Sequence, residues 1–299
     1  MDERYAQYSR EDFYSQIYHN AEIYPPPIEH ESIFLEIMSG CRYGKCLFCD
    51  FRRDRLTIYG LEDIERQLGL LRAIEDDKNR MHFLGCNPFF LGTEILVFLC
   101  EMTKMYLPKV TEINMYARAD DINAKSDAEL RELRAAGITD LHVGLESGSD
   151  EILAYHQKGE TVADIERALL RLEEADIKYH VTMIPGLGGK QYSREHAVKT
   201  AEMLSRLHPD TIWCISLKLW ENTPLYDMAE SGSFEPLTPH EILGEERDMV
   251  SRLNLTKPCH YVDSTVLQKY TLSVMLPEGK ESLLKAMDQL LSGELRPGE

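Results

Sequence analysis

The sequence lacks the features that define membrane, secreted and nucleic-acid-binding proteins. Its 299 residues contain no apolar run near the ~20 residues that span a bilayer, and the first residues show no signal-peptide pattern. Positive charge is scarce, because 33 lysines and arginines face 51 aspartates and glutamates, which gives a net charge of −18. Such an acidic chain repels a phosphate backbone, which argues against a nucleic-acid substrate. We therefore expect a cytoplasmic protein that contacts neither membranes nor nucleic acids.

Cysteine is sparse outside one short segment. Cys41, Cys46 and Cys49 fall within nine residues, and the other cysteines are scattered singly. Thiolates this crowded oxidise or share a metal, and disulfides are rare in a reducing compartment, so we expect a metal site. Structural zinc takes four protein ligands, and neither His30 nor His82 stands at a usual finger spacing. Three thiolates favour a four-iron cluster with one iron open to an exogenous chelating ligand, while zinc or no metal are the alternatives.

Apolar runs alternate with segments of helical periodicity along the middle of the chain. No linker rich in glycine, serine and proline interrupts this part, and 43% hydrophobic residues suffice for a large core. Strands that alternate with helices predict a parallel sheet. We expect six strands, at residues 33–39, 81–85, 110–116, 140–145, 177–184 and 211–219. Six strand–helix units fall short of the eight that close a TIM barrel.

One expected helix has clear signals at both ends. Ser126 is followed three residues later by Glu129, which is the capping-box pattern of a helix N-terminus. Gly137 is then expected to end this helix, because glycine accepts the left-handed conformation of a C-terminal cap.

The cysteine spacing carries a family resemblance. Cys41, Cys46 and Cys49, with the aromatic Phe48 before the last cysteine, resemble the cluster loop of radical S-adenosylmethionine (SAM) enzymes. The commonest spacing in that superfamily is C-x3-C-x2-C, whereas this chain has C-x4-C-x2-C. This spacing resembles a variant found in a group of small members of the superfamily. The resemblance implies a 4Fe-4S cluster whose open iron is chelated by the amino and carboxylate groups of SAM. One electron from the cluster then cleaves SAM to methionine and a 5′-deoxyadenosyl radical, which abstracts hydrogen from a substrate.

The same resemblance implies the fold, an α/β partial (β/α)6 TIM-like barrel. From the residues outside the barrel we further expect an N-terminal arm and a C-terminal helical extension that packs on the barrel. The arm would span residues 1–30, the barrel residues 31–230 and the extension residues 231–299. In barrels of this kind, functional side chains gather at the carboxyl ends of the strands.

Cofactor contacts are implied after the second and third strands. Gly85 and Cys86 stand where the family has a glycine-rich turn for the amino group of the methionine moiety. Gly85 fits that pattern, whereas Cys86 replaces the second glycine. Arg118 follows the third strand and is a further expected contact. Phe48 of the cysteine loop is expected to pack near the adenine.

Further contacts are implied after the fourth and fifth strands. Residues 145–153 are similar to the branch that contains oxygen-independent coproporphyrinogen oxidases, methylthiotransferases and the Elongator catalytic subunit. In that branch the residue at Glu146 binds the ribose hydroxyls, and a basic residue, here Lys158, binds the methionine carboxylate. Ser147 belongs to the same expected site. After the fifth strand, residues 183–189, with Ile184 and Gly186, resemble the apolar bed for adenine.

We therefore expect a radical SAM enzyme that acts on a small-molecule substrate under anaerobic conditions. The alternatives from other classes are a non-catalytic iron–sulfur protein for electron transfer or sensing, and a zinc-stabilised barrel that binds a partner. Residues 41–58 carry a local net charge of +3 within the acidic chain. An acidic electron donor such as a flavodoxin or ferredoxin is therefore an expected partner, although ordinary solvated arginines explain the same charge.

A last candidate group lies near the C-terminus. Cys259, His260, Tyr261 and Asp263 occur within residues 257–270 and include the side chains that most often carry protons. They are candidates for a proton donor or radical relay near the substrate. The simpler interpretation is the edge of a strand.

Overall fold

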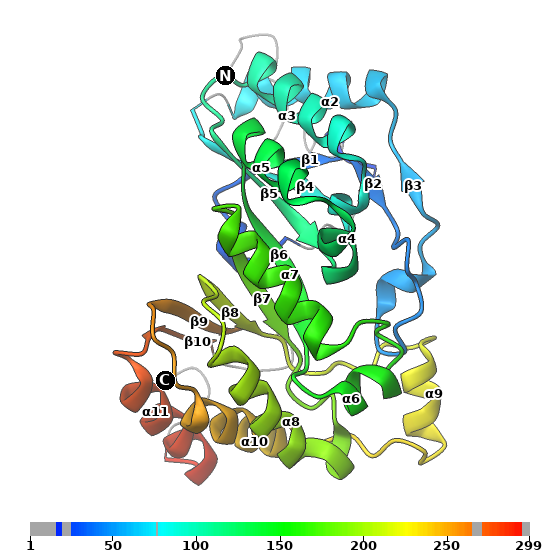
Figure 1. The fold of residues 1–299 in the computed structure, drawn as a ribbon. Helices are drawn as coiled ribbons and strands as arrows, with labels where there is room; N and C mark the ends of the chain where they lie inside the picture. Colours follow the sequence, from blue (N-terminus) through cyan, green and yellow to red (C-terminus); the bar gives the residue numbers. More distant parts are fainter. Residues whose placement is uncertain (1–15, 20–24, 76, 265–270, 295–299) are drawn as a thin grey trace. The chain divides into compact units, whose positions relative to one another are not determined.

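The computed structural model describes residues 16–19, 25–75, 77–264 and 271–294 (Figure 1). Most of the expected N-terminal arm lies outside these residues. The chain divides into two compact units, one formed by residues 1–44, 51–142 and 172–177 and the other by residues 45–50, 143–171 and 178–299. The three-part division into arm, barrel and extension stays a prediction.

The first unit contains three parallel neighbouring strands, β1 (Ile33–Glu36), β4 (Arg80–Leu84) and β5 (Glu112–Ala117). Alternate residues face opposite sides, as the period of a strand requires. Met81 is buried and contacts Thr103 of helix α3, whereas Arg80 and His82 lie on the other face. The helices of this unit are α2 (Leu61–Ile74), α3 (Thr93–Tyr106), α4 (Ala119–Ala124) and α5 (Asp127–Ala136). Short elements are β2 (Met38–Ser39), β3 (Thr57–Ile58), η2 (Pro27–Glu29), η3 (Asp50–Arg53) and η4 (Pro88–Phe90).

Helix α5 begins and ends where its sequence signals predict. The Ser126 hydroxyl accepts a hydrogen bond from the Glu129 amide at 3.2 Å, and the Glu129 carboxylate accepts one from the Ser126 amide at 2.7 Å. Gly137 takes a positive φ of 112° directly after the helix. The capping box is therefore confirmed, because both orphan amides at the N-terminus find partners within four residues.

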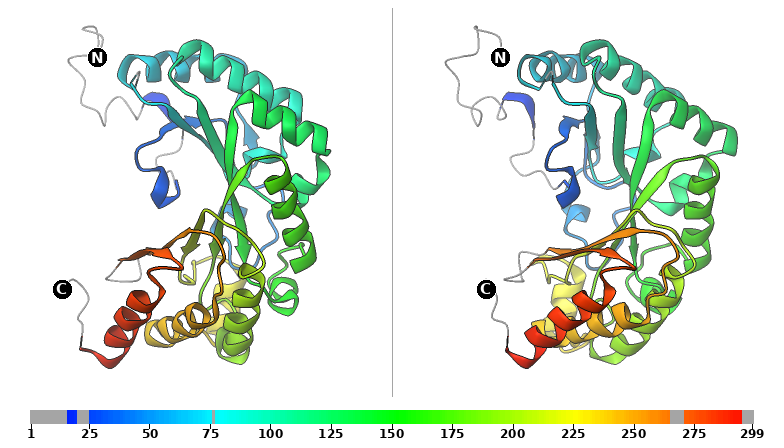
Figure 2. Two further views of the ribbon diagram at one scale, coloured as in Figure 1. Left: turned by 60° about the vertical axis from the view of Figure 1, so that its left-hand side comes forward. Right: turned by 90° about the vertical axis from the view of Figure 1, so that its left-hand side faces the viewer.

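The second unit contains the strands β7 (Lys178–Met183), β8 (Thr211–Cys214) and β9 (Cys259–Ser264), which run parallel, and β10 (Thr271–Leu276), which runs antiparallel to β9. Its helices α8 (Gly189–Leu204) and α10 (Pro239–Arg252) pack against each other (Figure 2). The remaining helices are α6 (Asp150–Tyr155), α9 (Pro224–Glu230) and α11 (Lys280–Ser292). Strand β6 (Ile138–Glu146) and helix α7 (Val162–Glu174) contribute residues to both units.

The strand order is β1-β4-β5-β6-β7-β8-β9-β10. All six expected strands are present, and the last of them, β8, ends at Cys214 rather than at residue 219. The expected helical extension is not purely helical, because β9 continues the parallel order beside β8 and β10 forms the sheet edge. In the described residues, no helix has the length and apolar character needed to cross a membrane.

Candidate functional site

The first part of the cysteine loop, Cys41 to Gly44, is attached to the end of β5. Arg118 places its guanidinium 4.1 Å from the ring centre of Tyr43, in a cation–π contact, and its Nε donates to Asp120 at 3.0 Å. Arg42 lies 3.4 Å from Asp121. Arg118, an expected cofactor contact, therefore orders the loop beside Cys41, and its role toward SAM stays a prediction.

The second part of the loop, Lys45 to Asp50, is attached to the second unit by its backbone. The Leu47 amide donates to the His156 carbonyl at 3.0 Å, and the Leu47 carbonyl accepts the Leu225 amide at 3.2 Å. Phe48 packs edge-on against the His156 ring at 5.7 Å. His156 Nε2 in turn donates to the Leu187 carbonyl at 2.7 Å, and burial lowers the pKa of His156 to about 4. A neutral, hydrogen-bonded imidazole thus fixes the ring that precedes Cys49.

The loop cysteines differ from the core cysteines in their surroundings. Cys41, Cys46 and Cys49 carry thiols rather than disulfide bonds, and Cys41 and Cys49 are partly exposed. Burial raises the pKa of Cys100 and of Cys259 to about 12, so these two thiols stay protonated. Metals bind the thiolate form. The three loop cysteines therefore fit the ligand set of a 4Fe-4S cluster better than the core cysteines do.

Glu146, the residue expected to bind the ribose, lies at the end of β6, and one of its carboxylate oxygens has no hydrogen-bond partner among the described residues. Lys158 Nζ lies 3.2 Å from Glu146 Oε1 and 3.5 Å from Glu160 Oε2, and all three side chains are largely buried. Glu146 Oε2 is buried and accepts no hydrogen bond from any described residue. A buried carboxylate oxygen without a donor is destabilising unless a ligand supplies one. The hydroxyls of a ribose would satisfy it, so the residue fits the role that the resemblance implies.

The absence of a side chain at Gly144 leaves room for the ion pair of Glu146 and Lys158. A Cβ atom at Gly144 would lie 2.3 Å from Glu146 Oε1 and 3.0 Å from Lys158 Nζ. Any other residue at this position would displace the two charged groups. No local sequence pattern indicates this requirement, because Gly144 looks like an ordinary strand residue.

Ser147 has a local role in the loop that follows Glu146. Its hydroxyl accepts a hydrogen bond from the Ser149 amide at 3.1 Å, and the side chain is fully buried. The Ser147 amide donates to the Leu145 carbonyl at 2.8 Å. These contacts explain why serine shapes this turn, and its contact with the cofactor stays a prediction.

The expected adenine bed is joined to the end of β6 and to helix α10. The Ile184 amide donates to the Glu146 carbonyl at 3.2 Å. The Gly186 amide donates to Glu245 Oε1 at 2.7 Å, and Gly186 has a positive φ of 89°. His196 lies between Glu146 and Glu245 and contacts both. Neither Glu245 nor His196 was identified from the sequence, because they lie far from Glu146 along the chain and no local pattern marks them.

The turn after β4 requires glycine at its first position. Gly85 has a φ of 146°, and a Cβ atom there would lie 2.3 Å from Met38 Cγ. The next residue, Cys86, is partly buried. Asn87 donates to Asp121 Oδ2 at 2.6 Å and accepts the Arg118 amide at 3.2 Å, so it fixes the turn to the end of β5. The contacts of Gly85 and Cys86 with SAM stay predictions.

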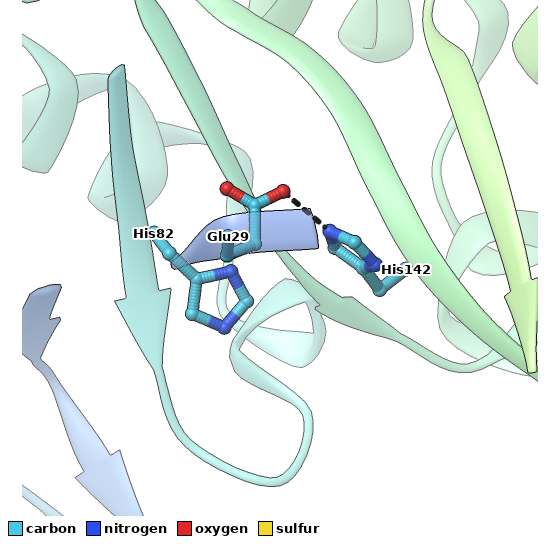
Figure 3. Close-up of side chains that lie close together, drawn as sticks. All are labelled: Glu29, His82 and His142. Atoms are coloured by element: carbon cyan, nitrogen blue, oxygen red, sulfur yellow. Dashed lines mark hydrogen bonds and ion pairs between the residues drawn. The ribbon is translucent and has the colours of Figure 1, made fainter. Parts of the chain in front are cut away.

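A cluster of buried polar side chains surrounds Glu29 in the first unit. Glu29, His82 and His142 offer possible metal-ligand atoms within 4.8 Å of one another (Figure 3). However, the Glu29 carboxylate already accepts hydrogen bonds from Arg80 at 2.6 and 2.9 Å, from His142 at 2.9 Å and from Asn114 at 3.0 Å. Burial raises the pKa of Glu29, but the bonds from His142 and Arg80 outweigh it and hold this pKa far below the usual value. The group is therefore closed by its own hydrogen bonds.

The side chain of Asn114 determines the protonation of His82. Because the Asn114 amide nitrogen donates to Glu29, its oxygen faces His82 Nδ1 at 2.5 Å. An acceptor opposite Nδ1 requires that Nδ1 carry the hydrogen. Burial lowers the pKa of His82, so the ring is neutral and Nε2 is an acceptor. In Figure 3 this second ring nitrogen points away from Glu29, and it is buried without a partner in the described part of the chain.

The candidate relay residues lie against helix α10. The Tyr261 hydroxyl donates to Glu246 of α10 and lies 3.3 Å from Cys214 Sγ. Asp263 is fully buried beside Glu246, and burial raises the pKa of both carboxyl groups. His260, on the other face of β9, contacts Ser273 at 2.8 Å. Tyr261 and Asp263 are thus part of the strand–helix core, and a relay through them stays a prediction.

Comparisons with known proteins agree with these features. The Radical SAM superfamily model matches residues 35–204, which is more than half of the chain. A tRNA uridine(34) acetyltransferase from Methanocaldococcus infernus is 25% identical over 119 residues, which are 40% of this chain and 22% of that protein. The match therefore spans about a fifth of the length of this curated relative.

Solved structures show the same fold. Coproporphyrinogen III oxidase from Escherichia coli, a radical SAM enzyme, superposes with a TM-score of 0.56 and 16% identity over 82% of this chain and 55% of that chain. Methylornithine synthase superposes with a TM-score of 0.55 and 16% identity over 83% of this chain and 71% of that chain. The predicted α/β partial TIM-like barrel is thereby confirmed, as is the resemblance to the branch with the Elongator subunit and the coproporphyrinogen oxidases. The chain therefore belongs to the radical SAM superfamily and is an enzyme whose cofactors are a 4Fe-4S cluster and S-adenosylmethionine.

Proposed function

We propose that this enzyme cleaves SAM reductively and uses the resulting radical to abstract hydrogen from a small-molecule substrate. The observation that carries the proposal is the buried Glu146 Oε2, which lacks a donor among the described residues and suits a ribose diol. When bound, the cluster supplies one electron that cleaves SAM to methionine and a 5′-deoxyadenosyl radical. The net charge of −18 supports a small substrate over a nucleic acid.

The protein's own residues would bind and orient the cofactors. Cys41, Cys46 and Cys49 would hold the cluster, because a loop attached through Tyr43 and Leu47 presents their thiols. Glu146 would accept the ribose hydroxyls, while Lys158 places a positive charge 3.2 Å from the other oxygen of the same carboxylate. A preorganised acceptor of this kind binds its ligand without reorganisation.

Anaerobic reconstitution with iron and sulfide tests this proposal. After reduction with dithionite, wild-type protein should form 5′-deoxyadenosine and methionine from SAM. Glu146→Gln should load the same amount of iron but bind SAM at least about tenfold more weakly, because a lost charge-assisted hydrogen bond is worth about 1.5 kcal/mol or more. Cys46→Ala should load little iron, and Cys100→Ala, which removes a core cysteine instead, is its matched control and should load iron normally.

Two results would contradict the proposal. The first is SAM cleavage no greater than in a dithionite blank. The second is a reconstituted cluster whose electron-spin signal ignores added SAM, which would favour an electron-transfer or sensing protein instead.

We further propose an acidic protein such as a flavodoxin or ferredoxin as the electron donor. Arg42, within the cysteine loop, and Arg55, shortly after it, are exposed in an otherwise acidic chain. Complementary charge mainly raises the association rate, and salt screens it. Arg42→Glu and Arg55→Glu should slow reduction by such a donor several-fold at low ionic strength and much less at high ionic strength. Lys257→Glu, an exposed charge near the other end of the sequence, is the control. Equal rates in all variants would contradict the proposal.

A further inference from the structure

A histidine and a glutamate behind the expected SAM site connect two of its segments. His196 of α8 donates from Nε2 to the Glu146 carbonyl at 3.1 Å, and its Nδ1 lies 2.9 Å from Glu245 Oε1 of α10. The same Oε1 accepts the Gly186 amide at 2.7 Å. His196 and Glu245 are both buried and belong to one unit of the chain. Glu245 Oε1 thus connects the expected adenine-binding segment, residues 183–189, to the backbone of Glu146 through His196.

The hydrogen-bond partners fix one hydrogen of the His196 ring. A carbonyl oxygen only accepts, so the hydrogen opposite Glu146 must reside on His196 Nε2. The other ring nitrogen, Nδ1, is bonded to Glu245 Oε1, the oxygen that also accepts the Gly186 amide. The ring is therefore held at both nitrogens by groups of the expected cofactor site and of α10.

The backbone conformation of Glu146 explains why the bond from His196 matters. Glu146 has a φ of 63°, a left-handed conformation that is unfavourable for a residue with a Cβ atom. That conformation persists only where neighbouring groups hold it. The bond from His196 to the Glu146 carbonyl does so, together with the Ile184 amide at 3.2 Å.

We propose that Glu245 and His196 form a positioning pair that aligns Glu146 and Gly186 for SAM. This inference rests on the proposed SAM contacts of those two residues. Glu245 comes from α10, which lies beyond residues 35–204 that the superfamily model matches. The C-terminal segment therefore has a direct part in building the cofactor site. Ile242 of the same helix packs against Gly186, where an added Cβ atom would lie 3.1 Å from Ile242 Cγ1.

Glu245→Gln is the sharpest variant, because it keeps the shape and removes one charge. An uncharged His196 carries one hydrogen and cannot donate to both neighbours. If the glutamine oxygen keeps Gly186, then Nδ1 takes the hydrogen and Nε2 faces the Glu146 carbonyl without one. If the glutamine nitrogen donates to His196 instead, the Gly186 amide loses its acceptor. In either arrangement one hydrogen bond is lost, so the backbone of either Glu146 or Gly186 is held less firmly.

The reconstituted holoenzyme provides the main test. We expect Glu245→Gln and His196→Gln to raise the KM for SAM in 5′-deoxyadenosine formation about tenfold, with turnover at saturating SAM within twofold of wild type. A variant that merely folded less well would lower turnover and leave KM unchanged. The double variant should be no worse than the worse single variant, because the two residues act as one unit. Asp248→Asn, which removes a carboxylate from an exposed ion pair on the same helix, is the control.

The outcomes separate this inference from the proposed function. If Glu146→Gln weakens SAM binding and Glu245→Gln leaves KM within twofold of wild type, the positioning pair is wrong and the proposed function stands. If neither variant affects SAM, the proposed contact of Glu146 is wrong as well. Nitrogen-15 NMR of the wild-type holoenzyme gives a test that needs no variant. His196 Nε2 should carry a hydrogen, because it faces the Glu146 carbonyl, and a ring without a hydrogen on Nε2 would overturn the proposal even if the variants fail to fold.

Discussion

Lys158 and Glu146 form a buried ion pair, with Nζ 3.2 Å from Oε1, at the end of strand β6. The pair uses one carboxylate oxygen and leaves the other unbonded within the described residues. Glu146, expected to bind the ribose, and Lys158, expected to bind the methionine carboxylate, therefore contact each other. Lys158 therefore places a positive charge beside the Glu146 carboxylate before any cofactor binds.

Lys158→Met should destabilise the protein and abolish tight SAM binding. Removing one partner of a buried ion pair leaves an uncompensated charge, which costs about 3–5 kcal/mol. Urea unfolding followed by circular dichroism measures the free energy of unfolding, and equilibrium dialysis measures SAM binding. Lys190→Met is the control, because Lys190 is exposed and 4.0 Å from Glu241, and it should change stability by less than about 1 kcal/mol. Equal losses in both variants would show that the burial of Lys158 has no special role.

Gly144→Ala should weaken SAM binding more than it weakens the fold. The new methyl group would lie 2.3 Å from Glu146 Oε1, which is too close for two non-bonded atoms, so it would push the carboxylate from its place. We expect SAM affinity to fall by about tenfold or more, which corresponds to about 1.4 kcal/mol. Gly69→Ala in helix α2, with no atom within 4 Å of its added Cβ, should leave SAM affinity unchanged. Unchanged affinity in Gly144→Ala would mean that Glu146 is not held where the cofactor needs it.

Stability should fall as the pH rises, because Asp263 and Glu246 are buried together. Burial raises the pKa of both carboxyl groups above their unfolded values. The folded state therefore binds more protons, and its advantage is complete below the unfolded pKa and lost as the pH rises through the folded pKa. Asp263→Asn should raise the melting temperature at pH 8 relative to wild type and flatten its decline between pH 5 and pH 8. Glu230→Gln, an exposed carboxylate on α9, should leave the pH profile as it is, and a similar profile in all three proteins would contradict the buried pair.

His82 should remain neutral well below the usual pKa of histidine. Burial lowers the pKa of His82, and Asn114 fixes its hydrogen on Nδ1. A histidine with a lowered folded pKa stabilises the protein above its unfolded pKa of about 6.5 and loses this contribution as the pH falls. Nitrogen-15 NMR at pH 6 should show a single Nδ1–H tautomer. Asn114→Asp, which puts a negative charge beside Nδ1, should raise the pKa of His82, and a wild-type ring that titrates near 6.5 would refute the prediction.

Local sequence patterns account for the parts of the fold that depend on neighbouring residues. Three cysteines within nine residues indicate a cluster loop wherever the chain places it, because ligand spacing is a property of the segment itself. The capping box of Ser126 and Glu129 is equally local, and so are the apolar runs of the six strands. Near Cys259 the sequence indicated at most the edge of a strand, whereas Cys259–Ser264 forms β9, the seventh parallel strand. This segment mixes polar and apolar residues, and only its pairing with β8 makes it a core strand.

The sequence by itself determined the superfamily, the cofactors and the alternation of the first six strands with helices. Only the tertiary structure decided that Gly144 makes room for Glu146 and Lys158, and that His196 and Glu245 support the backbone of Glu146. These residues come from strands and helices that are distant in the chain and meet through packing. Periodicity reports which face of an element is buried, but the partner of each buried polar group depends on which elements are neighbours in space.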